Sequence, residues 1–485
     1  MVEKVFEKSR WIGTGLRETV GVTGKKSPAN EFRKEFNCAD FNMAVCYICG
    51  LGFFELYVNG KRVGDEVLSP AFSNYDKRCY YSTFDLNKYL INGKNVIAVI
   101  VGNGHYNQTA GDAWEFDSAS WRDNPKMIFS LFIDGQPFLN SDTDWKVRRS
   151  TINYHNNIRT GDYYDATEED GFMEVGYNDS EWYEARIVAP PAGKLVPSDM
   201  PPIRECETYY PVDMWQSEKG WVFDFGVNIA GYAEITAEEE RGVQAVIRYA
   251  EQLKGKELDQ YEIGKHVYSG EFSTDKYTFK GKGVESWKPK FSYHGFRYVE
   301  IIGLSKKPDK NTIKAHFIHT DFEKVGDFSS SDELINWIYE CGIRSFLSNY
   351  QSFPTDCPHR EKNGWTGDAH LSSEYAFRIF DIESSFNKWL TDITDCQKDN
   401  GIIPCIAPTS AWGYNWGSGA SWDYAMFKIP YVAYLENGTT EGFDRIYTAA
   451  KKYLDYALNY RKDGLVEYAL RQCCYCHSRT RREWC

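Results

Sequence analysis

Residues 355–375 read TDCPHREKNGWTGDAHLSSEY and combine acids, aromatic rings, prolines and glycines at irregular spacing. In and beside this stretch lie residues that oppose a regular helix: Pro354, Pro358, Gly364 and Gly367. We therefore expect loop geometry to aim the carboxylates of Asp356, Glu361 and Asp368. The rest of the chain is interpreted as a scaffold for this loop.

Carboxylates clustered in an aromatic pocket can acquire different pKa values, so that one stays protonated at neutral pH while another is ionised. One protonated and one ionised carboxyl group are what hydrolysis of a glycosidic bond requires. Trp365 fits the same hypothesis, because an indole offers a flat apolar face to a sugar ring and an N–H to a hydroxyl. The alternative is a salt-bridged loop in which Arg360 and Lys362 neutralise the acids. The residues alone leave both interpretations open.

The stretch resembles the signature of bacterial α-L-rhamnosidases, glycoside hydrolase family 78, whose members carry Asp-Cys-Pro-x-Arg followed by Gly-Trp-x-Gly-Asp at this place. The resemblance implies inverting hydrolysis of terminal α-L-rhamnosides, with Glu361 as the general acid. It also implies the residues that hold the sugar, namely Asp356, Arg360, Trp365 and Asp368.

The composition of the whole chain favours a multidomain protein with a neutral ligand. A chain of 485 residues is too long for one ordinary core, so two to four domains are expected. Aromatic residues make up 16%, which suits β-sandwiches and carbohydrate sites, although a large core would also use them. The net charge of −13 argues against nucleic acid or an anionic membrane as partner.

The N-terminus carries charges throughout and lacks the apolar core of a secretory signal. No apolar run approaches the roughly 20 residues of a membrane helix. Thirteen cysteines without a disulfide framework then suggest reduced thiols and a cytoplasmic protein. Cys46 and Cys49 form one CxxC, for which zinc is the alternative to a strand interior. We expect no cofactor and no metal, and the oligomeric state stays open.

Strand patterns dominate the first part of the chain. Phe54, Leu56 and Val58 alternate with other residues and lead into Asn59-Gly60, a strong hairpin signal. Residues 55–86 resemble the accessory sugar-binding sandwich of rhamnosidases. We expect a β-sandwich over residues 1–125, a β-rich continuation over 126–202 that ends at a Pro-Pro pair, and a second β-sandwich over 203–325, which resembles the β-domain that precedes the catalytic domain in that family.

The hydrophobic period changes after residue 327. Ser330 and Glu333 predict a capping box, and one face of the helix that follows carries Leu334, Ile338, Cys341 and Ser345. Further helices are predicted over residues 376–390, 422–435 and 439–458. The resemblance implies that residues 326–470 form the first part of an (α/α)6 toroid.

A loop rich in glycine and tryptophan, CIAPTSAWGYNWGSGASWDYA, occupies residues 405–425. Tryptophan side chains in a loop either pack on the rim of a domain or contact a bound ligand. Rhamnosidases have a similar loop followed by Trp-Asp, so the resemblance makes Trp422 and Asp423 substrate-binding residues. For Trp412 and Trp416 both interpretations stay open.

About half of the helices of a toroid fit before residue 485, and no residue here corresponds to the family's general base. Residues 471–485, RQCCYCHSRTRREWC, form a basic, cysteine-rich tail without apolar periodicity. A frameshift or truncation would produce such an ending, and metal binding by the tail is the alternative. The expected function is therefore rhamnoside hydrolysis, incomplete without the base. The second hypothesis is a carbohydrate-binding remnant of such an enzyme that does not catalyse.

Overall fold

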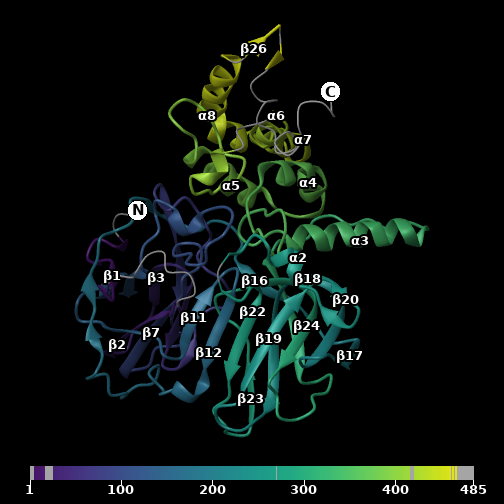
Figure 1. Ribbon diagram of the computed structural model, residues 1–485. Helices are drawn as coiled ribbons and strands as arrows, with labels where there is room; N and C mark the ends of the chain where they lie inside the picture. Colours follow the sequence, from purple (N-terminus) through teal and green to yellow (C-terminus); the bar gives the residue numbers. More distant parts are fainter. Residues whose placement is uncertain are drawn as a thin grey trace.

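A computed structural model of the chain describes residues 5–16, 26–268, 270–415, 420–459, 461–463 and 465–466 (Figure 1). The predicted tail at 471–485 and Trp416 lie outside the described residues. Strands occupy the chain up to residue 320, apart from short helical turns, and helices follow from residue 333. The change of hydrophobic period after residue 327 is thus a real change of architecture.

The N-terminal region is a sandwich of two sheets. One sheet has the order β14 (Arg186–Ile187), β1 (Ile12–Gly13), β8 (Lys126–Ile133), β3 (Ala44–Leu51), β6 (Arg78–Asp85) and β15 (Lys194–Pro197), with β9 (Gln136–Asn140) on β8. The other has the order β13 (Tyr183–Glu184), β10 (Lys146–Arg149), β2 (Asn30–Cys38), β7 (Gly93–Val101), β4 (Phe54–Val58) and β5 (Lys61–Arg62).

Residues 126–202 are not the separate continuation that the sequence predicts. Most of their strands complete the two sheets of the sandwich, so residue 125 is no boundary. Two others, β11 (Asn153–Asn157) and β12 (Gly161–Asp165), join the next sheet of the chain instead, because β12 pairs in parallel with β22. The sandwich and the second β-region therefore interlock through this excursion.

The strand β7 shows why both faces of the sandwich are apolar. Ile97, Val99 and Val101 point into the interior of the sandwich, whereas Ala98 and Ile100 belong to a larger core shared with the rest of the chain. Successive side chains of a strand point to opposite faces, so one strand serves two cores. Cys46 and Cys49 of β3 likewise face different cores, and they do not form one metal site.

The second β-region is a ten-stranded sheet. Its order is β11, β12, β22 (Thr274–Thr278), β19 (Gln244–Ala250), β24 (His294–Ile302), β18 (Trp221–Glu238), β25 (Ile313–Thr320) and β16 (Ile203–Tyr209), with β17 (Asp213–Gln216) and β23 (Val284–Trp287) also on β18. The long strand β18 changes partner along its length, and its pairing with β24 shifts between Asp224 and Ile229. A small hairpin, β20 (Leu253–Lys254) and β21 (Glu257–Leu258), and the helix α2 (Tyr261–Gly264) border the sheet.

The helical region stands on the two β-regions (Figure 1). It consists of α3 (Glu333–Ser348), α4 (Thr366–Ile379), α5 (Glu383–Asp395), α6 (Ala420–Asp423), α7 (Ala425–Asn437) and α8 (Glu441–Leu458), followed by the short pair β26 (Arg461–Lys462) and β27 (Leu465–Val466). The prediction of a single helix over residues 376–390 is wrong, because the helix is interrupted between the end of α4 at Ile379 and the start of α5 at Glu383. Asp381 bonds Glu323 there through its backbone N–H.

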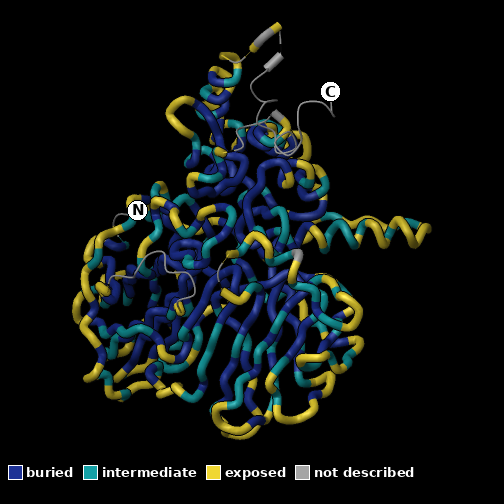
Figure 2. The backbone as a smooth tube through the Cα atoms, viewed as in Figure 1, coloured by how far each residue is buried: buried dark blue, intermediate teal, exposed yellow. Residues whose placement is uncertain are grey.

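The start of α3 also differs from the prediction. Asp332, not Ser330, caps the helix, and its carboxylate accepts the N–H of Leu334 at 2.9 Å. A carboxylate directly before the first turn satisfies a free N–H and favours the helix dipole. Figures 1 and 2 show α3 projecting from the rest of the chain, and Leu334 and Ile338 on the predicted face are 62% and 56% exposed.

Contacts from the sandwich anchor the helical region. The ammonium of Lys388 in α5 donates to the carbonyl of Phe72, and the guanidinium of Arg78 holds Asp395 through two hydrogen bonds. The large core runs without interruption from the sandwich to α8. Among the described residues, no helix combines the length and the apolar character needed to cross a membrane.

Candidate functional site

The candidate site is a loop between α3 and α4 that hydrogen-bonds to itself. The backbone N–H of Asp356 donates to the carbonyl of Asn363 at 3.1 Å, and the N–H of Asn363 donates back to Oδ1 of Asp356 at 3.2 Å. Lys362 donates its N–H to the carbonyl of Cys357. These bonds close residues 356–363 into a compact turn, so loop geometry does aim Asp356 and Glu361, as the sequence predicts.

For Asp368 the same prediction is wrong. The helix α4 begins at Thr366, so Gly367 and Asp368 lie in its first turn. Trp365 precedes the helix in extended conformation and has no side-chain capping bond. An acid in the first turn is favourable near the positive end of the helix dipole, which gives Asp368 a structural role beside any role in binding.

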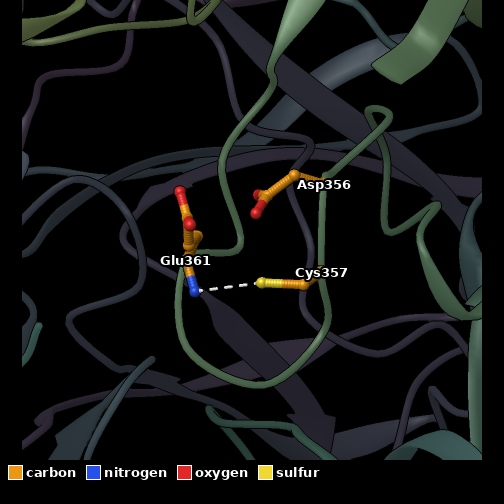
Figure 3. Close-up of side chains that lie close together, drawn as sticks. All are labelled: Asp356, Cys357 and Glu361. Atoms are coloured by element: carbon orange, nitrogen blue, oxygen red, sulfur yellow. Dashed lines mark hydrogen bonds between the residues drawn. The ribbon is translucent and has the colours of Figure 1, made fainter. Parts of the chain in front are cut away.

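Glu361 lies among groups that orient its carboxylate. The indole N–H of Trp365 donates to Oε2 at 2.8 Å, and Nε of Arg360 lies 3.8 Å from Oε1. Figure 3 shows the carboxylates of Glu361 and Asp356 side by side, with the thiol of Cys357 below them. One carboxylate oxygen of each acid and Sγ of Cys357 all lie within 4.8 Å of one another.

This arrangement gives Asp356 an unusual pKa. Burial is the largest cause and the negative charge of Glu361 adds to it, so that the pKa of Asp356 rises to about 8. Hydrogen bonds from the thiol of Cys357 and from the N–H of Asn363 oppose this rise only in part. One of the two neighbouring carboxyls therefore carries a proton at neutral pH.

Cys357 completes the cluster. Its sulfur accepts the backbone N–H of Glu361 at 3.4 Å. Burial and the charge of Asp356 raise the pKa of the thiol well above its ordinary value. Three donors this close could hold a metal, but a metal binds the thiolate and not the thiol. Burial therefore keeps this thiol protonated beside the carboxyl pair.

Trp422 lies against the first turn of α4. A β-carbon placed on Gly367 would come within 2.6 Å of Cε2 of Trp422, so only a glycine fits there without a shift. The indole Nε1 of Trp422 is buried, and no described residue hydrogen-bonds it. Trp412 contacts Trp365 edge to face, with the ring centroids 6.1 Å apart. An aromatic wall thus extends from Glu361 toward Trp422 and includes Trp412.

Asp423, the residue after Trp422, contacts the helix α8. It is 1% exposed, and its Oδ2 accepts a hydrogen bond of 2.6 Å from the hydroxyl of Tyr453 in α8. The structure thus brings Asp356, Arg360, Glu361 and Trp365 together and sets Trp422 beside them. Asp368 is exposed, although neighbouring atoms still desolvate it enough to raise its pKa.

The alternative of a simple salt-bridged loop fails for Lys362. This side chain is buried, and its ammonium donates to the carbonyls of Ile158 and Tyr293 at 2.5 Å each. Sequence reasoning missed these contacts, and it also missed Arg159 and Cys357. Cys357 stands inside the quoted motif, whereas nothing near Arg159 in the sequence points to the site.

A proton-holding carboxyl pair beside aromatic side chains, at the start of a helical region that follows β-domains, is typical of multidomain glycosidases. Three family descriptions match the chain in order: residues 39–207 match the α-L-rhamnosidase N-terminal domain, 215–319 the concanavalin-like domain and 323–474 the 6-hairpin glycosidase domain of bacterial α-L-rhamnosidases. The chain belongs to the bacterial α-L-rhamnosidase family.

Individual relatives agree with this assignment. An α-L-rhamnosidase of Formosa agariphila is 35% identical over 468 residues, which are 92% of this chain and 49% of the relative. The structure of an α-L-rhamnosidase from Dictyoglomus thermophilum superimposes with a TM-score of 0.88 at 34% identity, over 96% of this chain and 53% of that one. A Streptomyces avermitilis α-L-rhamnosidase complexed with L-rhamnose gives 0.83 at 26% identity, over 90% and 42%. The chain spans about half the length of these relatives.

Proposed function

We propose that this chain binds the terminal L-rhamnose of a rhamnoside and carries the acid side of an inverting glycosidase site. Glu361 is the proton donor, and Asp356 holds the sugar beside it. The observation that carries the proposal is the carboxyl pair of Asp356 and Glu361, which holds a proton at neutral pH and is oriented by Trp365.

The spacing of the pair limits the role of Asp356. An inverting base stands about 6.5 to 9.5 Å from the acid, so that a water molecule fits between them. Oxygens of Asp356 and Glu361 lie within 4.8 Å of each other, which is too close for that water. A carboxyl that stays protonated near neutral pH is also a poor nucleophile. Asp356 is therefore assigned to sugar hydroxyls, and the base has to be another carboxylate.

Hydrolysis then proceeds from the groups that the loop supplies. The proton that the pair holds passes from Asp356 to Glu361, and Glu361 gives it to the glycosidic oxygen as the bond to the anomeric carbon breaks. A water molecule, deprotonated by a carboxylate other than these two, forms the new bond to that carbon. Asp356 and Arg360 bind hydroxyls of the sugar, and the wall of Trp365 and Trp422 covers its apolar face. Asp368, in the first turn of α4, contributes a further acceptor at the edge of the pocket.

The test measures binding and turnover separately on the 485-residue chain. Calorimetry with L-rhamnose reports binding, and release of an aryl group from an aryl α-L-rhamnoside reports turnover. Glu361→Gln should keep the affinity and lower any turnover, by about 10² to 10⁴-fold for a poor leaving group and by less for an aryl group that leaves readily, because the amide keeps the shape and cannot donate the proton. Binding without turnover in the unmodified chain supports the second hypothesis, a carbohydrate-binding protein that does not catalyse. Absence of both would refute the proposal.

A further inference from the structure

The loop that carries Glu361 is held by hydrogen bonds from a residue outside the helical region. Arg159 lies between β11 and β12 and is 1% exposed. One of its terminal nitrogens donates to the backbone carbonyl of Glu361 at 2.8 Å and to Oδ1 of Asn363 at 3.1 Å. A guanidinium is always charged in proteins and presents its donors in a rigid fork, so it holds both acceptors in one plane.

Arg159 is itself held by the sandwich. Its other terminal nitrogen donates to Oε1 of Gln108 and lies 3.2 Å from Oδ2 of Asp112, a carboxylate with no exposed surface. The rings of Trp114 and Phe116 lie 5.3 and 5.4 Å from the guanidinium carbon. All four residues come from one segment after β7, so the N-terminal sandwich determines where the guanidinium sits.

The backbone beside Glu361 needs such support. Lys362 has a φ of 53°, a left-handed conformation that is unfavourable for a side chain of this size. Its buried ammonium is tied to Ile158, the residue directly before Arg159, and to Tyr293. The second β-region also touches the loop, since a β-carbon on Gly295 would meet the backbone nitrogen of His359 at 2.9 Å.

Arg159 is also connected to Asp356, through Asn363. The side chain of Asn363 receives Arg159, while its backbone exchanges two hydrogen bonds with Asp356. A displacement of the guanidinium would therefore move both carboxyls. Catalytic groups tolerate about 0.5 Å of misplacement, and about 1 Å can cost 10²-fold in rate.

We propose that Arg159 is a positioning residue for the carboxyl pair of Glu361 and Asp356, and that the N-terminal sandwich is thereby a working part of the site and not only an accessory domain. The inference rests on the proposed function of Glu361 for its consequence in catalysis. The contacts themselves do not depend on it.

The test uses the full chain labelled with 5-fluorotryptophan and followed by fluorine NMR. The indole N–H of Trp365 bonds the carboxylate of Glu361, so its signal reports the position and titration of the pair without any substrate. Trp365→Phe assigns that signal among the 15 tryptophans. Arg78→Lys is the matched control, because Arg78 also joins the sandwich to the helical region, at Asp395 and away from the loop.

Arg159→Lys should move the Trp365 signal and shift its titration midpoint by about 0.5 to 1 pH unit, and Arg159→Met by more. Arg78→Lys should change neither. Where turnover is measurable, Arg159→Lys should lower kcat about 10- to 100-fold with a much smaller change in KM. If Arg159→Met does not fold, Gln108→Ala is the milder variant, and it should move the signal in the same direction.

An unchanged Trp365 signal in Arg159→Lys and Gln108→Ala would overturn the proposal. An equal change of the Trp365 signal in Arg78→Lys would overturn it too. Any disturbance of the interface between the sandwich and the helical region would then move the signal. Failure of the proposed function looks different: the unmodified chain would neither bind L-rhamnose nor release it, while the Trp365 signal would still decide the role of Arg159.

Discussion

The indole N–H of Trp365 donates a hydrogen bond of 2.8 Å to Oε2 of Glu361, four residues earlier in the same turn of chain. This bond fixes one oxygen of the carboxylate and leaves the other facing Arg360 at 3.8 Å. Trp365 is 8% exposed, so this bond lies in a poorly solvated place, where a hydrogen bond to a carboxylate is strong.

Trp365→Phe removes this donor and keeps most of the ring. A hydrogen bond to a charged group contributes about 1.5 to 3 kcal/mol, so turnover of an aryl α-L-rhamnoside should fall about 10-fold or more. The melting temperature should change little, because the ring still packs on Trp412. Steady-state kinetics beside a thermal melt checks this, and equal kinetics in the two proteins would show that the bond does not orient Glu361.

Asp356→Asn tests the shared proton through the pH dependence of stability. The raised pKa belongs to the folded state, so the stabilisation from the proton on Asp356 is complete below about pH 4 and is lost as the pH rises through about 8. Asn does not titrate and can still accept the N–H of Asn363. The free energy of unfolding of Asp356→Asn, relative to the unmodified chain, should thus increase by up to about 1.4 kcal/mol per pH unit across that window.

Urea unfolding of both proteins at several pH values measures that difference directly. Other buried acids with raised pKa values, such as Asp162 and Asp392, affect both proteins equally and cancel. A difference that stays constant with pH would show that Asp356 titrates normally in the folded chain.

Gly367→Ala tests the packing of Trp422 on α4. The added methyl group would collide with the indole at 2.6 Å, and overpacking of this kind costs about 1 to 3 kcal/mol. Displacement of Trp422 should also weaken binding of L-rhamnose in calorimetry. Gly342→Ala in α3 is the control, since no atom lies within 4 Å of its added β-carbon and alanine favours a helix by about 0.5 to 1 kcal/mol. Undiminished affinity in Gly367→Ala would separate Trp422 from the sugar.

The hydrogen bond between Asp423 and Tyr453 allows a test of whether Asp423 has a structural role or binds the substrate. The buried bond between them predicts that Tyr453→Phe lowers stability by about 1.5 to 3 kcal/mol and leaves L-rhamnose affinity unchanged. Asp423→Asn should then also act on stability, with a coupling between the two changes in a double-mutant cycle. If Asp423→Asn instead weakens sugar binding and shows no coupling, Asp423 is the substrate-binding residue that the family resemblance implies.

Local patterns in the sequence predicted the order of the architecture well. The alternation that leads into Asn59-Gly60 is confirmed as the hairpin of β4 and β5, and the change of period after residue 327 as the start of the helices. Boundaries were predicted less well. The helix over 376–390 is two helices, and the cap of α3 is Asp332, because a residue or two decides a helix end and several polar candidates stand close together.

By itself the sequence determined which residues are chemically able to act. The spacing of Asp356, Glu361 and Trp365 within one loop is a property of the chain, since prolines and glycines around them exclude a helix and leave a turn. Family membership followed from the same motif.

Only the tertiary structure decided how those residues are held and charged. The raised pKa of Asp356 comes from burial under other parts of the fold, and the carbonyl of Glu361 is fixed by Arg159, 202 residues earlier in the sequence. Asp423, which stands beside Trp422 in the sequence, is hydrogen-bonded by Tyr453 of α8, 30 residues later. Burial and contacts between distant segments depend on how the domains pack together, and no local pattern contains that information.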